Sequence, residues 1–193
     1  WSCRFFLACS AGPGHLHALP ARRAPGGLGA FNAQELANTV WAFAKAEQRA
    51  PALVEAVADE AARRGLGEFK AQELANTAWA FAKAEQPAPA LFEAVAEEAV
   101  RRGLAEFNSQ NIANTMWALA VLDVRHAGLV AACTTRAAEL EASLRPEGPR
   151  QLHQAQLWIE HEWKRPDLLL APPLRAQCRS AMSMDAPSPS ALQ

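Results

Sequence analysis

The sequence predicts an all-α fold, a right-handed α-solenoid of stacked helical hairpins, on three observations. A 38-residue segment occurs three times, beginning at Phe31, Phe69 and Phe107, and a period between about 20 and 50 residues is typical of solenoids. The first two copies differ at only seven positions, so we expect them to fold in the same way. Alanine, which has the highest helix propensity, dominates the composition, whereas β-branched residues are sparse and Tyr is absent.

Each copy contains two helices marked by terminal signals. In the first copy we expect a helix from near Asn32 to about Ala46, because the Asn32 side chain can cap it and Glu35 can reach back. Lys70 replaces Asn32 in the second copy, so its cap should be weaker. Residues 47–50 turn the chain. The second helix begins at Pro51 in the first copy and at Pro89 in the second. It ends at Arg63-Arg64-Gly65 and at Arg101-Arg102-Gly103, respectively. On the surface of the first of these helices, Glu60 can pair with Arg64, or Asp59 with Arg63, because each pair is spaced i,i+4.

The third copy departs from this pattern near its end. Val121 replaces the lysine, no proline starts the second helix, and that helix is predicted over residues 128–144. Such decay is typical of a terminal repeat, because the last repeat has no neighbour on one side. A further helix is predicted from Pro149 to Pro166, followed by a short amphipathic turn; the apolar positions expected in these two elements are Leu152, Ala155, Ile159 and Trp163, then Leu174, Cys178 and Ala181.

We therefore divide the chain into residues 1–30, three repeats (31–68, 69–106 and 107–144), a C-terminal helical cap (145–184) and a Pro/Ser-rich tail expected to be disordered (185–193). Residues 1–30 allow two interpretations, and because they begin with Trp rather than Met we expect a fragment or a processed chain. Their three arginines and lack of acidic residues are a bias found in organelle transit peptides. The alignment of Gly26–Phe31 with the chain before Phe69 favours a degraded repeat instead.

Composition argues against several classes of function. The formal net charge is −1, and each of the first two copies has four basic and six acidic residues, so binding of a polyanion would need a local stripe. No run of apolar residues approaches the roughly 18 needed to cross a bilayer, so we expect no membrane span. We also expect no metal, cofactor, small-molecule substrate or catalytic residue. The cysteines form no C-x-x-C pair, the histidines no i,i+4 pair, and no nucleophile–base pair or glycine-rich phosphate loop is present.

One set of side chains on the first helix of each copy stands apart from the core. At 100° per residue, Leu36, Ala37, Val40, Phe43 and Ala44 form a broad apolar face, while four other residues fall within about 40° of a different direction. We call these four positions the column, and stacked repeats would align the columns into a ladder. The column consists of Gln34, Asn38, Trp41 and Lys45 in the first copy, Gln72, Asn76, Trp79 and Lys83 in the second, and Gln110, Asn114 and Trp117, followed by Val121, in the third.

The column residues have the chemistry to contact single-stranded RNA. An amide can bond a base edge, an indole can stack on a base and an ammonium can meet a phosphate, so each repeat could engage about one nucleotide. Each type also has a structural alternative. The tryptophans could pack between repeats, the asparagines could bond the loop backbone of the adjacent repeat, the glutamines could help to cap the helices, and the lysines could serve solubility.

The repeated core resembles a family of 38-residue organellar helical repeats. The matching segments are Leu36–Ala44 (LANTVWAFA), Leu74–Ala82 and Ile112–Ala120, and they resemble octotricopeptide repeats and the repeats of proteins that carry a C-terminal RAP domain. Residues 152–158 and 172–178 look like the stretch that precedes a RAP domain, although that domain has no counterpart in these 193 residues. Related solenoids occur in FAST-kinase-type proteins and in RNA-editing complexes.

This resemblance implies RNA processing, stability, editing or translation in mitochondria or plastids. We therefore expect a non-catalytic RNA-binding protein whose partners are single-stranded RNA and proteins of a ribonucleoprotein complex. The alternative is an armadillo-like scaffold that holds an extended peptide, since such solenoids also use Asn and Trp ladders. The 38-residue unit is shorter than the roughly 40–47 residues of armadillo and HEAT repeats, which favours the RNA interpretation.

Overall fold

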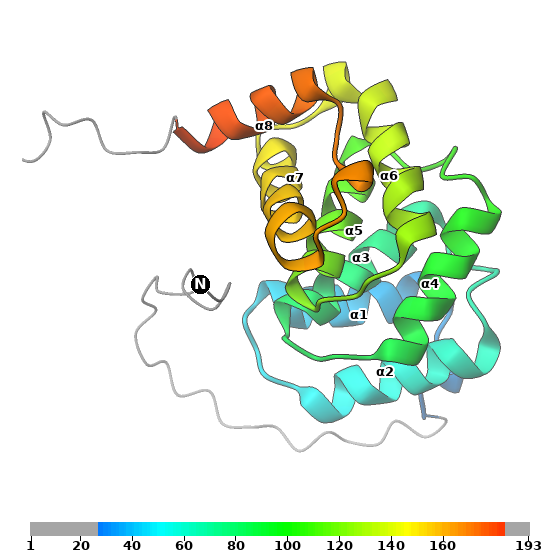
Figure 1. The fold of residues 1–193 in the computed structure, drawn as a ribbon. Coiled ribbons are helices and arrows are strands. Elements are labelled where there is room, and N and C mark those ends of the chain that lie inside the picture. The colour runs from blue at the N-terminus through cyan, green and yellow to red at the C-terminus, as the bar shows by residue number, and fades with distance from the viewer. Residues whose placement is uncertain (1–26, 184–193) are drawn as a thin grey trace, which may run out of the picture.

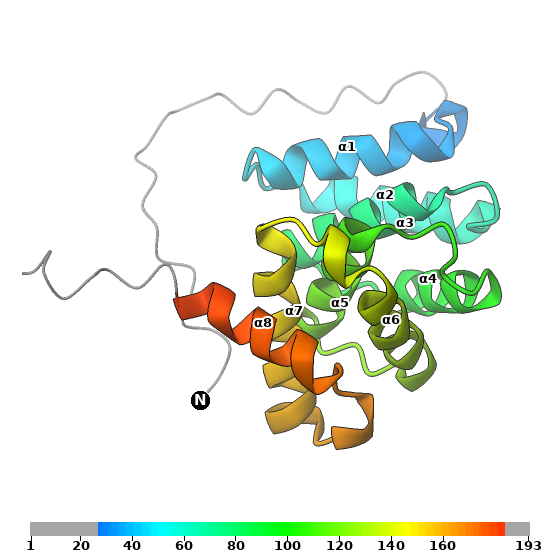
Figure 2. The ribbon, with the colours of Figure 1, turned by 90° about the horizontal axis from the view of Figure 1, so that it is seen from above.

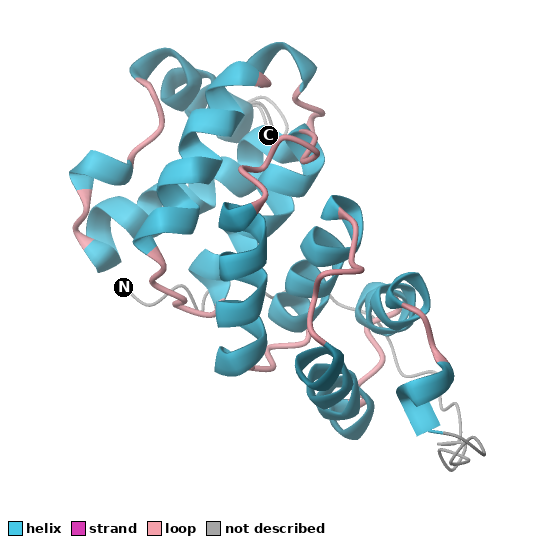
Figure 3. Cartoon of the chain, turned by 90° about the vertical axis from the view of Figure 1, so that its right-hand side faces the viewer, coloured by secondary structure: helices cyan, strands magenta, loops and turns pink. Residues whose placement is uncertain are grey.

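The structure is a computed structural model that describes residues 27–183, and within that range it contains helices and no strand (Figure 3). The predictions for residues 1–26 and for the tail from residue 184 lie outside the described residues. The three repeats supply α1 (Ala33–Lys45) and α2 (Pro51–Arg64), α3 (Ala71–Lys83) and α4 (Pro89–Arg101), and α5 (Ser109–Val121) and α6 (Ala127–Glu139). The C-terminal cap supplies α7 (Glu147–Leu157) and α8 (Pro172–Ser183).

The helices form two layers. Helices α1, α3, α5 and α7 pack side by side in sequence order, and α2, α4 and α6 pack in the same order as a second layer (Figures 1 and 2). Each repeat is therefore a helical hairpin that buries its apolar faces against the next hairpin, which confirms the predicted α-solenoid. Helix α1 lies at one edge of the stack, and α8 lies across the other end, against α7.

The predicted helix starts are confirmed. The Asn32 side chain accepts a hydrogen bond from the Glu35 amide (2.9 Å), and the Glu35 carboxylate accepts one from the Asn32 amide (2.8 Å). In the second copy the Lys70 side chain makes no cap bond, and only the Glu73 carboxylate accepts the Lys70 amide (2.8 Å). The α3 start is thus the weaker cap, as the sequence predicts.

Each first-layer helix ends in a left-handed residue, although none of these residues is glycine. Glu47, Glu85 and Asp123, 38 residues apart, have φ values of 54°, 53° and 53°. The next amide then bonds back into the last turn, as Gln48 does to the Phe43 carbonyl (3.0 Å), so the carbonyls at the helix end gain donors. This geometry reverses the chain from the first layer to the second.

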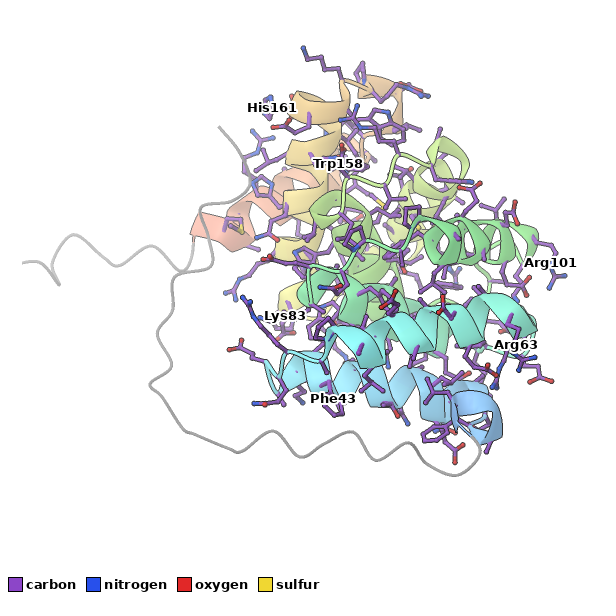
Figure 4. All side chains as sticks on the ribbon, turned by 90° about the horizontal axis from the view of Figure 1, so that it is seen from below. Phe43, Arg63, Lys83, Arg101, Trp158 and His161 are labelled. Atoms are coloured by element: carbon purple, nitrogen blue, oxygen red, sulfur yellow. The ribbon has the colours of Figure 1, made fainter. Side chains whose placement is uncertain are left out.

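An arginine at the end of each second-layer helix ties that helix to the start of its own repeat. Arg102 donates to the carbonyls of Phe69 (2.6 Å), Leu66 (3.1 Å) and Gly67 (2.9 Å), and to the Glu98 carboxylate (2.6 Å). Arg64 and Arg136 bond the equivalent loops before α1 and α5. We call this contact the arginine staple. Figure 4 shows that Arg63 and Arg101, each beside a staple arginine, lie at the same end of successive hairpins.

Of the two ion pairs predicted for the surface of α2, one is confirmed and the other is wrong. Arg64 pairs with Glu60 as predicted, but Arg63 pairs with Glu60 (2.7 Å) rather than with Asp59. Both arginines converge on one carboxylate, which sits one residue closer to them and on a longer side chain than Asp59. Hydrogen bonds from Arg63 and then Arg64 lower the pKa of Glu60 to about 2.

The predicted boundaries of α6 and α8 were wrong. Helix α6 spans Ala127–Glu139 rather than 128–144, and the His126 Nδ1 atom caps its start by accepting the Leu129 amide (2.9 Å). The chain then turns through a short 3₁₀ segment, Glu141–Ser143, where the Ser109 hydroxyl bonds the Ser143 carbonyl (2.8 Å). The predicted short turn near Leu174 is instead the twelve-residue α8, whose first two residues are prolines, a composition suited to a first helical turn.

One buried side chain anchors the C-terminal cap to the repeats, and a second fixes the path of the chain within the cap. Helix α7 continues into a π-helical segment, Trp158–Trp163, and its predicted stripe is buried at Leu152, Ala155 and Ile159. The Trp158 indole donates to Asp123 in the loop after α5 (2.9 Å). Gln156 accepts the Leu170 amide (2.8 Å), which fixes the path of the chain between α7 and α8.

Candidate nucleic-acid interface

The column residues lie on the surface of the first layer that faces away from α2, α4 and α6. The buried residues of α1, such as Leu36 and Val40, occupy the opposite side of the helix. Because α1, α3 and α5 pack in register, their columns stand next to one another, and Trp79 and Trp117 lie with ring centroids 6.2 Å apart. The structure thus brings the predicted residues together as a ladder on one face.

In the first copy the column is open to solvent. Gln34, Asn38 and Lys45 are exposed and Trp41 is half-buried. Neither Gln34 nor Asn38 makes a side-chain hydrogen bond within residues 27–183. The Lys45 ammonium lies over the Trp41 ring, 4.6 Å from its centroid, a distance at which a cation–π attraction stabilises the pair.

In the second copy the column is partly covered. Gln72 is exposed, whereas Asn76, Trp79 and Lys83 are half-buried. The amides of Gln72 and Asn76 again have no side-chain hydrogen bond to any described residue. Lys83 (Figure 4) donates to the Glu47 carboxylate of the preceding repeat (3.1 Å), so its charge is already paired.

In the third copy the column is built into the protein. Asn114 is only 8% exposed, and its Oδ1 atom accepts hydrogen bonds from Gln110 (2.8 Å) and from Gln151 of α7 (3.0 Å). The Trp117 indole donates to Gln154 of α7 (2.7 Å). Here the asparagine and the tryptophan have a structural role, although Asn114 bonds side chains and not the loop backbone that the sequence analysis offered as its alternative partner.

Sequence reasoning missed Gln151 and Gln154, which extend the ladder onto α7. They are three residues apart and contact the third column directly. The sequence does contain a pattern that could have identified them, because two glutamines at i and i+3 share one helix face. It was hidden because α7 lies outside the 38-residue repeat and carries neither the Asn-Thr pair nor the column tryptophan.

The ladder therefore has a free end and a closed end. On α1 and α3, four amide side chains lie beside two half-buried indoles with polar groups available to a ligand. On α5 and α7, the amides and the indole bond each other. Base stacking on an indole combined with amide contacts to base edges is the chemistry of sequence-tolerant RNA binding. The two column cations, by contrast, are already engaged with Trp41 and Glu47.

This difference predicts opposite effects for two matched substitutions. Asn114→Ala should lower the free energy of unfolding by about 1–3 kcal/mol, because Gln151 Nε2 loses its acceptor in a partly buried site. Asn38→Ala should change it by less than about 0.5 kcal/mol, since the exposed Asn38 amide bonds no described residue. Urea unfolding followed by circular dichroism measures both. Equal losses in the two variants would contradict the division of the ladder.

Between residues 27 and 183, no group of three or more His, Cys, Asp or Glu residues is placed to hold a metal ion. Burial raises the pKa of the Cys133 thiol to about 12 and that of Cys178 to about 11, so neither is a thiolate near neutral pH. Of the helices described, none has the length and apolar character to cross a bilayer.

Comparison with known proteins places the repeats in a family. Residues 16–145, about two thirds of the chain, match the family model described as RNA-editing substrate-binding complex 6 protein. No curated protein matches the chain. The match confirms the RNA-editing part of the resemblance seen in the sequence. The octotricopeptide, RAP-associated and FAST-kinase-type parts stay predictions.

Proposed function

This chain belongs to the RNA-editing substrate-binding complex 6 protein family, and we propose that it is a non-catalytic scaffold that holds single-stranded RNA within an RNA-editing complex. The family description names a substrate-binding complex, and the substrate of RNA editing is RNA. The proposal assigns the chain no reaction of its own. By the resemblance to organellar repeat proteins, it acts in a mitochondrion or plastid.

The observation that carries the proposal is the free end of the ladder. Asn38 and Asn76 lie beside Trp41 and Trp79 on adjacent helices, with amides that bond no other described side chain. An asparagine inside a helix lowers helix propensity, so an unbonded one repeated in register favours a binding role. A base stacked on each indole would contribute about 1–3 kcal/mol, which is enough for weak binding at each repeat.

Phosphate contacts must come from elsewhere than Lys45 and Lys83, which are engaged within the protein. The positive charge lies in the C-terminal cap: residues 145–183 hold six basic and four acidic residues, the reverse balance of the first two repeats. Arg175 and Arg179 are spaced i,i+4 on α8. The pKa of His153 on α7 is lowered by burial and then by the charge of Arg179, and α8 packs against α7.

The test is binding of a fluorescently labelled single-stranded RNA pool, measured by anisotropy from about 50 to 300 mM salt. Asn38→Ala/Asn76→Ala should raise the Kd about tenfold without changing the salt slope, because amides contact bases and release no counterions. Arg175→Gln/Arg179→Gln should reduce the slope of log K against log salt by about 1.4, since each single-strand phosphate contact contributes about 0.7.

The matched control is Gln48→Ala/Gln86→Ala, which removes two amides from the hairpin turns of the same two repeats. We expect this control to bind like the unmodified chain. No RNA binding at the lowest salt, or equal loss in the control, would overturn the proposal.

The second candidate is a scaffold for an extended peptide, and the engagement of both column lysines favours it. A peptide needs amide and indole contacts but no phosphate-binding cation, and the first two repeats are acidic. If the Asn38→Ala/Asn76→Ala variant keeps its RNA affinity but loses binding to protein components of the complex, this candidate replaces the first.

A further inference from the structure

The outer face of α1, which points away from α3, is exposed, whereas the same face is buried on α3 and α5. Phe43 is 39% exposed, whereas Phe81, its equivalent on α3, is 1% exposed and Leu119 on α5 is also 1% exposed. The sequence placed Phe43 in the core, and for the first copy this is wrong within the described residues. The other positions of this face behave alike: Glu35, Thr39 and Ala42 are exposed or half-buried, whereas Glu73, Thr77 and Ala80 are buried.

The face is shaped to receive a preceding repeat. It forms a shallow groove lined by Phe31, Glu35, Asn38, Thr39, Ala42 and Phe43. On α3 the equivalent residues are covered because α1 packs there. Figure 4 shows Phe43 at the free edge of the stack. At the opposite end of the described array, α8 already packs against α7, so only the α1 end presents an open repeat interface.

Residues 1–26 continue the repeat in register, without a gap. Shifted by 38 residues, Pro13 falls on Pro51, which begins α2, and Leu16 and Leu19 fall on Val54 and Val57, both buried. One further period places the same three on Pro89, Phe92 and Val95, which begin α4 and fill its buried face. Phe5 falls on Phe43 and Phe81. One proline of the segment thus falls on the helix starts, and two of its leucines fall on buried positions in both later copies.

The charge of residues 1–26 is opposite to that of the exposed acidic residues on the repeat that they would adjoin. The segment 1–26 contains Arg4, Arg22 and Arg23 and no acidic residue. The repeat that it would adjoin exposes Glu35, Glu55 and Asp59. The segment departs from the repeat at Pro20 and Pro25, which fall on Ala58 and Arg63 inside α2.

From these observations we propose that residues 1–26 cover the outer face of α1 and α2 as the last two thirds of a further repeat. This contact borders the proposed RNA-binding ladder, because Asn38 lines the groove as well as the first column. It would bury Phe43 in the way that α1 buries Phe81 on α3.

The test is hydrogen–deuterium exchange of the full 193-residue chain, read by mass spectrometry over residues 1–26. We expect slowed exchange in this segment, and Phe43→Glu should accelerate it about tenfold or more while lowering the thermal midpoint. Leu157→Glu is the matched control, because Leu157 is similarly exposed (41%) but lies on α7, and it should change neither quantity.

A second variant separates docking from damage to α1. Leu19→Glu alters only the segment, and it should accelerate exchange in α1 as well as in residues 1–26. Unprotected exchange of residues 1–26 in the unmodified chain would overturn the proposal, as would a Leu19→Glu variant identical to the unmodified chain. Protection of α1 that rises with protein concentration would also overturn it, since a second copy would then be the occupant.

Discussion

Arg102→Ala is expected to lower the free energy of unfolding by about 2–4 kcal/mol, one of the two largest effects of a single substitution in this chain. The guanidinium donates to three backbone carbonyls before α3 and to Glu98, and Arg102 is 18% exposed at its side chain. Its removal leaves partly buried acceptors without donors, each costing about 1–3 kcal/mol, with partial recovery from water.

The adjacent Arg101 supplies the control. Its side chain is 67% exposed and, among residues 27–183, bonds only the Glu98 carboxylate, so Arg101→Ala should cost less than half as much as Arg102→Ala, as expected for an exposed ion pair. Urea unfolding of both variants at neutral pH measures the difference. Comparable losses would show that the staple carbonyls contribute nothing, because both variants remove a partner of Glu98.

The same cluster gives a pH dependence. Hydrogen bonds from Arg101 and then Arg102 lower the pKa of Glu98 from an ordinary value of 4.5 to about 2. A carboxylate whose pKa falls on folding stabilises the folded state fully above its unfolded pKa, and this contribution disappears as pH falls from about 4.5 to about 2. The difference between Arg102→Ala and the unmodified chain should therefore shrink over that acid range.

The periodic part of the fold could be predicted because its signals are local. A proline at the first turn, an asparagine cap with a glutamate three residues on, and a glycine after two arginines each act within one turn of helix. Gly65 and Gly103 take positive φ values, which a glycine adopts without steric cost. A 38-residue repeat then fixes the stacking, since identical faces must pack in the same way.

What could not be predicted depends on contacts between distant residues. The arginine staples join residues 29 to 36 positions apart, and no helical periodicity encodes a bond from a side chain to a carbonyl of another loop. The His126 cap was missed because histidine is an uncommon residue at a helix start. Phe43 was misplaced because one helix at 100° per residue shows which face is apolar, but not whether a neighbour covers it.

The position of the column residues could be predicted from the sequence, but not which of them are hydrogen-bonded within the protein. Angle alone placed Asn38, Asn76 and Asn114 on one face, and the structure brings them together. It also separates them, because Asn114 is bonded by Gln110 and Gln151 while the other two are not. The same residue at equivalent positions thus differs in its hydrogen bonding because different helices stack beside it. Helix α5 meets α7, which carries glutamines instead of a fourth column. A substitution of all three asparagines would therefore mix a stability effect with a binding effect.

Phe81→Ala is expected to have an equal or larger effect, lowering the free energy of unfolding by about 3–5 kcal/mol. Phe81 is 1% exposed in the middle of the array, where α3 has neighbours on both sides, so truncation leaves a cavity that the packed helices cannot close. With typical domain stabilities of about 5–15 kcal/mol, this loss is enough to leave the chain marginally folded at 37 °C.

The chain itself supplies the control for Phe81, because Leu119 fills the equivalent position in the third copy and is equally buried. Phe81→Leu should therefore cost less than half as much as Phe81→Ala, since the position accommodates leucine within the same backbone. Thermal and urea unfolding of the two variants gives the comparison. If both variants lose the same amount, shape rather than buried volume governs this position, and the equivalence of the repeats would not extend to their cores.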